Sequence, residues 1–252
     1  MKRTLYRAVR GARHPQRAVE RRRIRAEIAR YLGGRDTLSG YAREVRESGL
    51  MEHLFEKARE HHEHVGGSGH SLGAIGYTEG VYLYGVMRRL RPEVAVETGV
   101  ANGFSTAFAL LALEKNGGGH RHSVDLPREV GRDYDEDTFY AGEGRAGIPA
   151  GSESGWLIPL ELKERWTLIL GRTQEELPPL LDRLGTVDSF MHDSEHSFEC
   201  MWFEFNEAWP HLRDGGVLLS DDVNSTEAFP RFAREHARQP VRLARGMALL
   251  EK

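Results

Sequence analysis

The sequence is poor in cysteine, with Cys200 as the only one among 252 residues. An intramolecular disulfide is therefore excluded, and a reducing, cytoplasmic location is the expectation. No apolar run approaches the roughly 18 to 20 residues that a membrane-spanning helix requires. The composition, with 39% hydrophobic and 29% charged residues, is instead typical of a chain that buries one sizeable core.

Two phosphate-binding motifs are also missing from the sequence. No glycine-rich loop carries the lysine of a P-loop. The glycine turn at residues 99–103 has Ala101 where the dinucleotide motif G-x-G-x-x-G has its middle glycine. This departure disfavours a pyrophosphate-binding, NAD-dependent oxidoreductase, which stays an alternative because it would use the same strand and turn.

The most informative feature that is present is a strand that breaks into this glycine turn and opens a helix. Residues 94–96 form an apolar run typical of a central parallel strand, and Glu97 follows with a carboxylate. Gly99 and Gly103 let the backbone approach a ligand closely, and Ser105 leads into an apolar helix. The free amides of that helix's first turn would face a bound anion.

A second predicted strand ends at Asp125, about twenty residues beyond the turn, where a carboxylate can accept both hydroxyls of a ribose. A glycine turn without provision for a diphosphate, followed by such a carboxylate, suits a nucleoside with an amino-acid tail. Further strands are predicted over 167–171, 187–193 and 217–221, with helices between them. This alternation indicates a parallel sheet covered on both faces, and two short strands about Gly246 predict an antiparallel edge.

Four motifs together carry a family resemblance. They are V-A-V-E-T-G-V-A-N-G-F-S-T at 94–106, G-R-T-Q-E-E-L-P at 171–178, V-D-S-F-M-H-D-S-E-H-S-F at 187–198, and W-P-H-L-R-D-G-G-V-L-L-S-D-D at 209–222. In this order they resemble class I S-adenosylmethionine-dependent methyltransferases, and most closely the metal-dependent O-methyltransferases of sugars and natural products.

The resemblance implies an α/β fold with a Rossmann-like, doubly wound sheet of about seven strands, mostly parallel with an antiparallel C-terminal hairpin. It also implies methyl transfer from S-adenosylmethionine to a hydroxyl of a small-molecule acceptor. The motifs and the positions after the strands together give these candidate cofactor-binding residues: Glu97, Gly99, Asn102, Gly103, Ser105, Asp125, Thr173 and Asp193.

Acidic residues close the fourth and fifth predicted strands. If those strands are neighbours, as the family topology implies, their ends lie about 5 Å apart, and carboxylates that close need a cation or a proton between them. The resemblance implies Asp193, Asp221 and Asp222 as ligands of Mg²⁺ or another divalent cation, which would lower the pKa of the acceptor hydroxyl. Because consecutive strand residues point to opposite faces, Asp221 and Asp222 can share one ion only if the strand has already ended. A metal-free site, with Asp222 contacting the substrate, is the alternative.

Two residues just past Asp193 are candidate catalytic bases. The resemblance favours an acidic residue two positions after the first ligand, which is Glu195, whereas His196 needs less pKa tuning to accept a proton near neutrality. The long segment 127–159 is interpreted as a cover over the site, with Tyr134, Phe139, Tyr140 and Trp156 as aromatic faces.

The N-terminal region differs in charge from the rest of the chain. Residues 1–35 hold twelve Lys or Arg and two Glu, a net charge of +10, so the remainder carries −13. We predict a basic helical extension over 1–70, containing an amphipathic helix with Ile24, Ile28 and Leu32 on its apolar side, and a catalytic domain over 71–252. The helix is expected to pack on the body or on a second subunit of a homo-oligomer. Attachment to nucleic acid or an anionic membrane, including a noncatalytic module held that way, is the alternative.

Overall fold

The computed structural model describes residues 15–64, 75–127, 129 and 147–252, and the aromatic candidates Tyr134, Phe139 and Tyr140 lie outside them. Within these ranges seven strands form one sheet in the order β3-β2-β1-β4-β5-β7-β6. The strands are β1 (Val94–Thr98), β2 (His120–Asp125), β3 (Trp166–Leu170), β4 (Val187–His192), β5 (Leu212–Ser220), β6 (Val241–Arg242) and β7 (Ala248–Glu251).

The strand directions confirm the predicted fold. Strands β1 to β5 are parallel, whereas β7 runs antiparallel to both β5 and β6. The order reverses between β1 and β4, and the carboxyl ends of strands beside such a reversal are where open α/β sheets bind ligands. Strand β5 begins at Leu212, five residues earlier than predicted, and its pairing with β4 shifts register between Val187 and Ser189.

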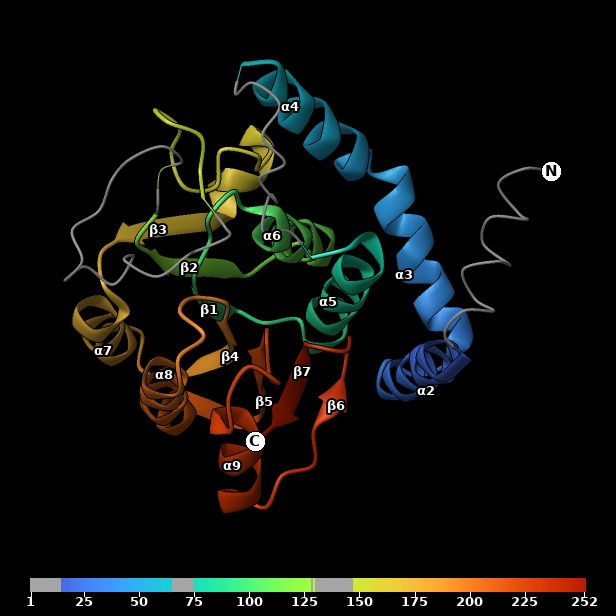
Figure 1. The fold of residues 1–252 in the computed structure, drawn as a ribbon, viewed down its shortest axis with the longest axis vertical. Coiled ribbons are helices and arrows are strands. Elements are labelled where there is room, and N and C mark those ends of the chain that lie inside the picture. The colour runs from blue at the N-terminus through green and yellow to red at the C-terminus, as the bar shows by residue number, and fades with distance from the viewer. Residues whose placement is uncertain (1–14, 65–74, 128, 130–146) are drawn as a thin grey trace.

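Helices cover both faces of the sheet (Figure 1). On one face lie α5 (Tyr77–Leu90) and α6 (Phe104–Asn116), with α3 (Arg35–Glu47) and α4 (Leu50–His64) outside them and α2 (Pro15–Tyr31) beside β6. On the other face lie α7 (Thr173–Leu184), α8 (Phe198–His211) and α9 (Ala228–Glu235). A short 3-10 helix, η1 (Leu160–Arg165), precedes β3.

The N-terminal helices share a hydrophobic core with the helices that cover the sheet. Ile28, Leu32 and Leu54 belong to the same buried cluster as Leu83 of α5 and Phe108 of α6. The predicted apolar side of α2 is therefore buried against the body of the chain. No helix among the described residues combines the length and the apolar character needed to cross a membrane.

An ion pair inside the sheet fixes the end of β1. The side chains of Glu97 and Arg121 are fully buried, and Arg121 Nη2 lies 2.6 Å from Glu97 Oε1. Glu97 Oε2 accepts hydrogen bonds from Arg121 Nε, the Ser123 hydroxyl and the Thr106 hydroxyl at 2.8 to 3.0 Å. The carboxylate of Glu97, predicted to bind a cofactor, is thus engaged within the core beneath the glycine turn.

We expect Arg121→Met to destabilise the protein by about 3–5 kcal/mol, because it leaves the Glu97 carboxylate buried without its countercharge. Adding Glu97→Gln should recover part of this loss, because the amide keeps an acceptor for Ser123 and Thr106 and carries no charge. Urea unfolding of both variants measures the difference. A double variant no more stable than Arg121→Met would contradict the role given to the ion pair.

Candidate active site

The glycine turn after β1 is shaped by the backbone that follows β4. Gly99 has a φ of 81°, and a Cβ at this position would lie 2.0 Å from the carbonyl oxygen of Asp193. The turn is tied on both sides, since Gly99 N–H donates to the carbonyl of Val124 at 2.9 Å and Asp193 N–H donates to that of Thr98 at 2.8 Å. Gly99 is therefore required by close packing within the protein, and this packing brings the ends of β1 and β4 together.

Asp125, at the end of β2, holds the same turn from its other side. Its carboxylate accepts hydrogen bonds from the backbone N–H groups of Val100 and Ala101, at 3.1 and 3.2 Å, and from the hydroxyl of Ser154 at 2.5 Å. Burial is the main cause that raises the pKa of this carboxyl group. Ala101, which replaces a glycine of the dinucleotide motif, takes a φ of 46° with its amide bound in this way. Asp125 therefore lies beside the turn, where the sequence analysis placed a ribose-binding carboxylate.

Residues 147–158 cover the turn. Gly155 N–H donates to the carbonyl of Ala101 at 2.8 Å, and Trp156 Nε1 donates to Asn102 Oδ1 at 2.6 Å. A Cβ on Gly103 would lie 2.7 Å from the Cα of Gly155, so this glycine is needed for contact with the cover. Asn102 and Gly103, both predicted to bind a cofactor, hold the described part of the cover in place.

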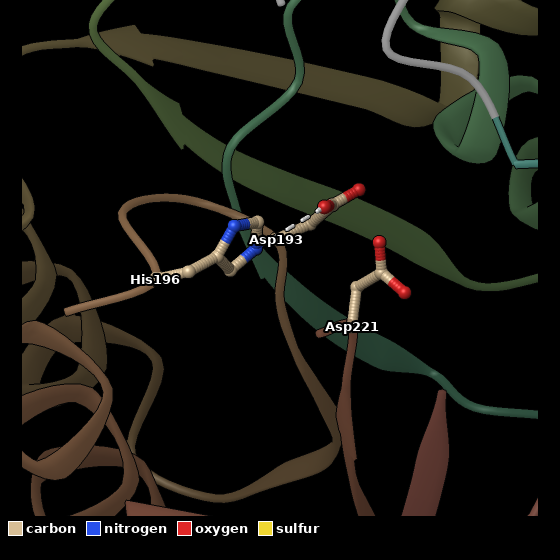
Figure 2. Close-up of side chains that lie close together, drawn as sticks. All are labelled: Asp193, His196 and Asp221. Atoms are coloured by element: carbon tan, nitrogen blue, oxygen red, sulfur yellow. Dashed lines mark ion pairs between the residues drawn. The ribbon is translucent and has the colours of Figure 1, made fainter. Parts of the chain in front are cut away.

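A second group of side chains gathers at the carboxyl ends of β4 and β5. Asp193, His196 and Asp221 point toward one another (Figure 2), and each offers a ligand atom within 4.8 Å of the others. His196 Nε2 lies 3.9 Å from Asp193 Oδ1. The Ser105 hydroxyl, at the start of α6, reaches Asp193 Oδ2 at 3.5 Å and so links this cluster to the glycine turn.

Asp222 is not one of these three residues. The strand has already ended at Asp222, so the alternation of strand side chains does not itself keep Asp222 away from the cluster. Strand β5 stops at Ser220, and Asp222 has a φ of 45°, outside the extended region. Its side chain is 59% exposed, and its Oδ2 lies 3.4 Å from Nδ1 of His196. Asp222 is therefore next to the ring of His196, on the nitrogen opposite the one that faces Asp193.

The crowding of carboxylates perturbs the protonation of the cluster. Burial, followed by the charges of Asp221 and Glu97, raises the pKa of Asp193 well above its usual range. Burial and the neighbouring Asp222 raise the pKa of Asp221 to about 6. Burial, with a contribution from His192, lowers the pKa of His196. An ion with positive charge at this place would favour the ionised carboxylates and the neutral imidazole.

A buried polar network supports the loop that carries Asp193. Glu204 of α8 is fully buried, and its carboxylate accepts hydrogen bonds from the hydroxyls of Thr98 and Ser194. It also lies 2.6 Å from Nδ1 of His192, which is itself fully buried. Glu204 was not among the predicted site residues, although an acidic residue among the apolar positions of α8 was the available signal. Its position ties the end of β1, the end of β4 and the following loop to one helix.

Two further predicted site residues, Glu195 and Thr173, have their contacts outside this cluster. Glu195 forms a hydrogen bond with Ser197, and burial is the main cause that raises the pKa of Glu195. Thr173, the first residue of α7, has its hydroxyl 3.9 Å from the thiol of Cys200. Neither side chain belongs to the cluster of Asp193, His196 and Asp221.

The comparisons with known proteins agree with this arrangement. A family model described as a methyltransferase domain matches residues 96–223, which is more than half of the chain. That span begins in β1 and ends just past Asp222, so it includes the turn, the cover and the acidic cluster. A comparison with curated proteins found no significant match.

Solved structures show the same fold. The SAH-bound methyltransferase PaMTH1 from Podospora anserina is 12% identical, with a TM-score of 0.54 over 81% of this chain and 87% of that one. The O-methyltransferase TomG from Streptomyces achromogenes, solved with SAM, is 19% identical, with a TM-score of 0.53 over 82% of this chain and 94% of that one. At these identities the likeness concerns the fold.

We expect Gly99→Ala to lower the free energy of unfolding by at least about 2 kcal/mol, because the methyl group meets the Asp193 carbonyl and the φ is positive. Gly118→Ala is the matched control, since a Cβ there meets nothing within 4 Å, and it should change stability by no more than about 0.5 kcal/mol. Equal effects of the two substitutions in urea unfolding would contradict the packing constraint.

Asp221→Asn should stabilise the metal-free protein at pH 8 by about 2–4 °C in Tm, the shift that 1 kcal/mol produces in a domain of this size. The folded pKa of about 6 lies above the unfolded value near 3.9, so the ionised carboxylate disfavours folding as pH rises between the two. The gain should shrink at pH 5, where the folded wild-type group is mostly protonated. Thermal unfolding in EDTA at both pH values checks this, and a gain that grows at pH 5 would refute it.

Proposed function

The chain belongs to the methyltransferase family, whose model spans residues 96–223, and we propose that it transfers a methyl group from S-adenosylmethionine to a hydroxyl of a small molecule. One observation carries the proposal. The glycine turn with Asp125 and the cluster of Asp193, His196 and Asp221 lie at the carboxyl ends of neighbouring strands, joined by the contact between Ser105 and Asp193. A nucleoside site and an acceptor site would then share one edge of the sheet.

We assign the nucleoside to the turn. Asp125 is placed to accept the ribose hydroxyls once its hydrogen bond from Ser154 is exchanged for the ligand, since a carboxylate offers about four acceptor positions. The amide end of α6, which begins at Phe104, would face the amino-acid tail of the cofactor. Asn102 and Trp156 hold the cover over this half of the site and would exclude water from it.

The residues at the other half fit a divalent cation. Two carboxylates and an imidazole offer ligand atoms within 4.8 Å of one another. Burial, with the charge of Asp221, raises the pKa of Asp193, and burial with the charge of Asp222 raises that of Asp221. Asp193 and Asp221 would hold the ion. When bound, a divalent cation supplies positive charge that lowers the pKa of a hydroxyl and orients it. The acceptor class, a sugar or natural-product hydroxyl, rests on the resemblance of the motifs.

The chain's own residues would then position the reactants. Methyl transfer needs the acceptor oxygen, the methyl carbon and the sulfur in line, so alignment contributes most of the rate enhancement. Ser105 and Asp193 fix the distance between the two halves of the site. We assign proton acceptance to Glu195 on the resemblance of its position, two residues after Asp193; its side chain, bonded to Ser197 outside the cluster, would have to turn toward the acceptor. His196, the other candidate base, faces the acidic cluster instead.

Calorimetric titration of the full chain tests the cofactor. We expect S-adenosylmethionine and S-adenosylhomocysteine to bind with Kd in the micromolar range, about −8 kcal/mol, and NAD to show no binding. Asp125→Ala should weaken binding of both sulfur nucleosides at least tenfold. Asp182→Ala, at a site whose side chain is 82% exposed, is the control and should leave binding unchanged. Binding of NAD alone, or Asp125→Ala with wild-type affinity, would contradict the proposal.

A further inference from the structure

We infer that His196 completes a metal-binding triad with Asp193 and Asp221, and that this site selects a first-row transition-metal ion over Mg²⁺. The inference rests on the proposed metal-assisted function and changes its ligand set, since the motif resemblance implied Asp222 as the third ligand. It also changes the expected metal, because one nitrogen and two oxygens form a different donor set from three carboxylates.

The three ligand atoms lie close enough to share one ion. Oxygen atoms of Asp193 and Asp221 and a ring nitrogen of His196 lie within 4.8 Å of one another, from loops that leave two neighbouring strands (Figure 2). Atoms bound to one ion at about 2.1 Å lie roughly 3 Å apart at right angles and about 4.2 Å apart when opposite. Small side-chain rotations therefore bring all three onto one ion, and positions stay open for water or an acceptor hydroxyl.

The two ring nitrogens of His196 have different surroundings. Nε2 of His196 is buried and has no hydrogen-bond partner among the described residues, although it lies 3.9 Å from Asp193 Oδ1. Its other nitrogen, Nδ1, faces the carboxylate of Asp222 at 3.4 Å. Histidines that bind metals commonly donate their second ring N–H to a carboxylate, which fixes the tautomer and leaves the other nitrogen to the metal. Asp222 is therefore placed to orient His196.

A nitrogen ligand favours a transition-metal ion over Mg²⁺. Mg²⁺ is bound by oxygen ligands and keeps several of its waters, whereas imidazole suits the transition metals. A set of two carboxylates and one histidine differs by one ligand from the triad of two histidines and one carboxylate that holds non-haem Fe²⁺ with open positions. Binding of Mn²⁺, Fe²⁺, Co²⁺ or Zn²⁺ would use all three side chains, while Mg²⁺ would gain little from His196.

The test uses Mn²⁺ as the probe on the full chain, with pulsed electron paramagnetic resonance as the readout. Electron spin-echo modulation from one coordinated ¹⁴N is expected in the wild type. It should be lost in His196→Gln and retained in Asp222→Asn, even though the latter lowers Mn²⁺ affinity by about 10 to 100-fold. His211→Gln, a histidine that pairs with the carbonyl of Gly185 away from the cluster, is the control and should keep the signal.

Competition between the two metals supplies a second readout. Mn²⁺ should bind the wild type at least about tenfold more tightly than Mg²⁺, and His196→Gln should remove most of that preference because it deletes the nitrogen ligand. A ¹⁴N signal that survives His196→Gln, a signal that is lost in Asp222→Asn while Mn²⁺ is still bound, or equal affinity for both metals in the wild type would overturn the inference. So would the absence of Mn²⁺ binding.

Failure of this inference is distinguishable from failure of the proposed function. Titration with S-adenosylmethionine in EDTA reports on the nucleoside half of the site without any metal. Cofactor binding with no ¹⁴N signal would leave the methyltransferase proposal in place and remove the triad. A ¹⁴N signal without cofactor binding would keep the metal site and remove the proposed reaction.

Discussion

The arrangement of the site depends on the close packing of the turn after β1 against the backbone after β4. A side chain at Gly99 would occupy the space of the Asp193 carbonyl, and the Thr98 carbonyl accepts the Asp193 N–H. The sheet order reverses between β1 and β4. The loops that follow these two strands therefore start side by side before they run in different directions. Because the backbone of Asp193 is held by these contacts, its side chain starts from a fixed point at the edge of the sheet.

Two chemically different half-sites follow from that contact. On the β2 side, Asp125 accepts two turn amides and the Ser154 hydroxyl, so the segment 147–158 is tied to the turn that it covers. On the β5 side, Asp193 meets Asp221 and His196 in a cluster where burial and neighbouring acidic side chains raise the pKa of both carboxyl groups. Glu97 and Glu204 are buried acids, each paired with a buried basic side chain, Arg121 and His192. The buried acids stabilise the frame, and the less buried cluster is available for chemistry.

The sequence predicted the parts of the fold that local patterns determine. Apolar runs predicted the strands. The same runs pointed to the glycine turn, Asp125 and the acidic residues after β4 and β5, because each of these marks the point at which an apolar run ends. The pairings between side chains of different segments were not predicted, because no local pattern says which residue another one will meet. Arg121 on Glu97, Ser154 on Asp125 and Glu204 beneath His192 are separated by 24, 29 and 12 residues. The third ligand of the proposed metal site, His196 or Asp222, likewise depends on the backbone conformation at Asp222, whose φ is 45°.

The most direct measurement of the central claim is a crystal structure of the full chain with S-adenosylhomocysteine. The account predicts the ribose hydroxyls on Asp125, the nucleoside beneath the 147–158 segment, and the sulfur directed toward the side of the site that holds Asp193 and Asp221. A nucleoside bound away from the turn, or a sulfur directed away from Asp193, would contradict the claim that one packed strand reversal builds both halves of a methyl-transfer site.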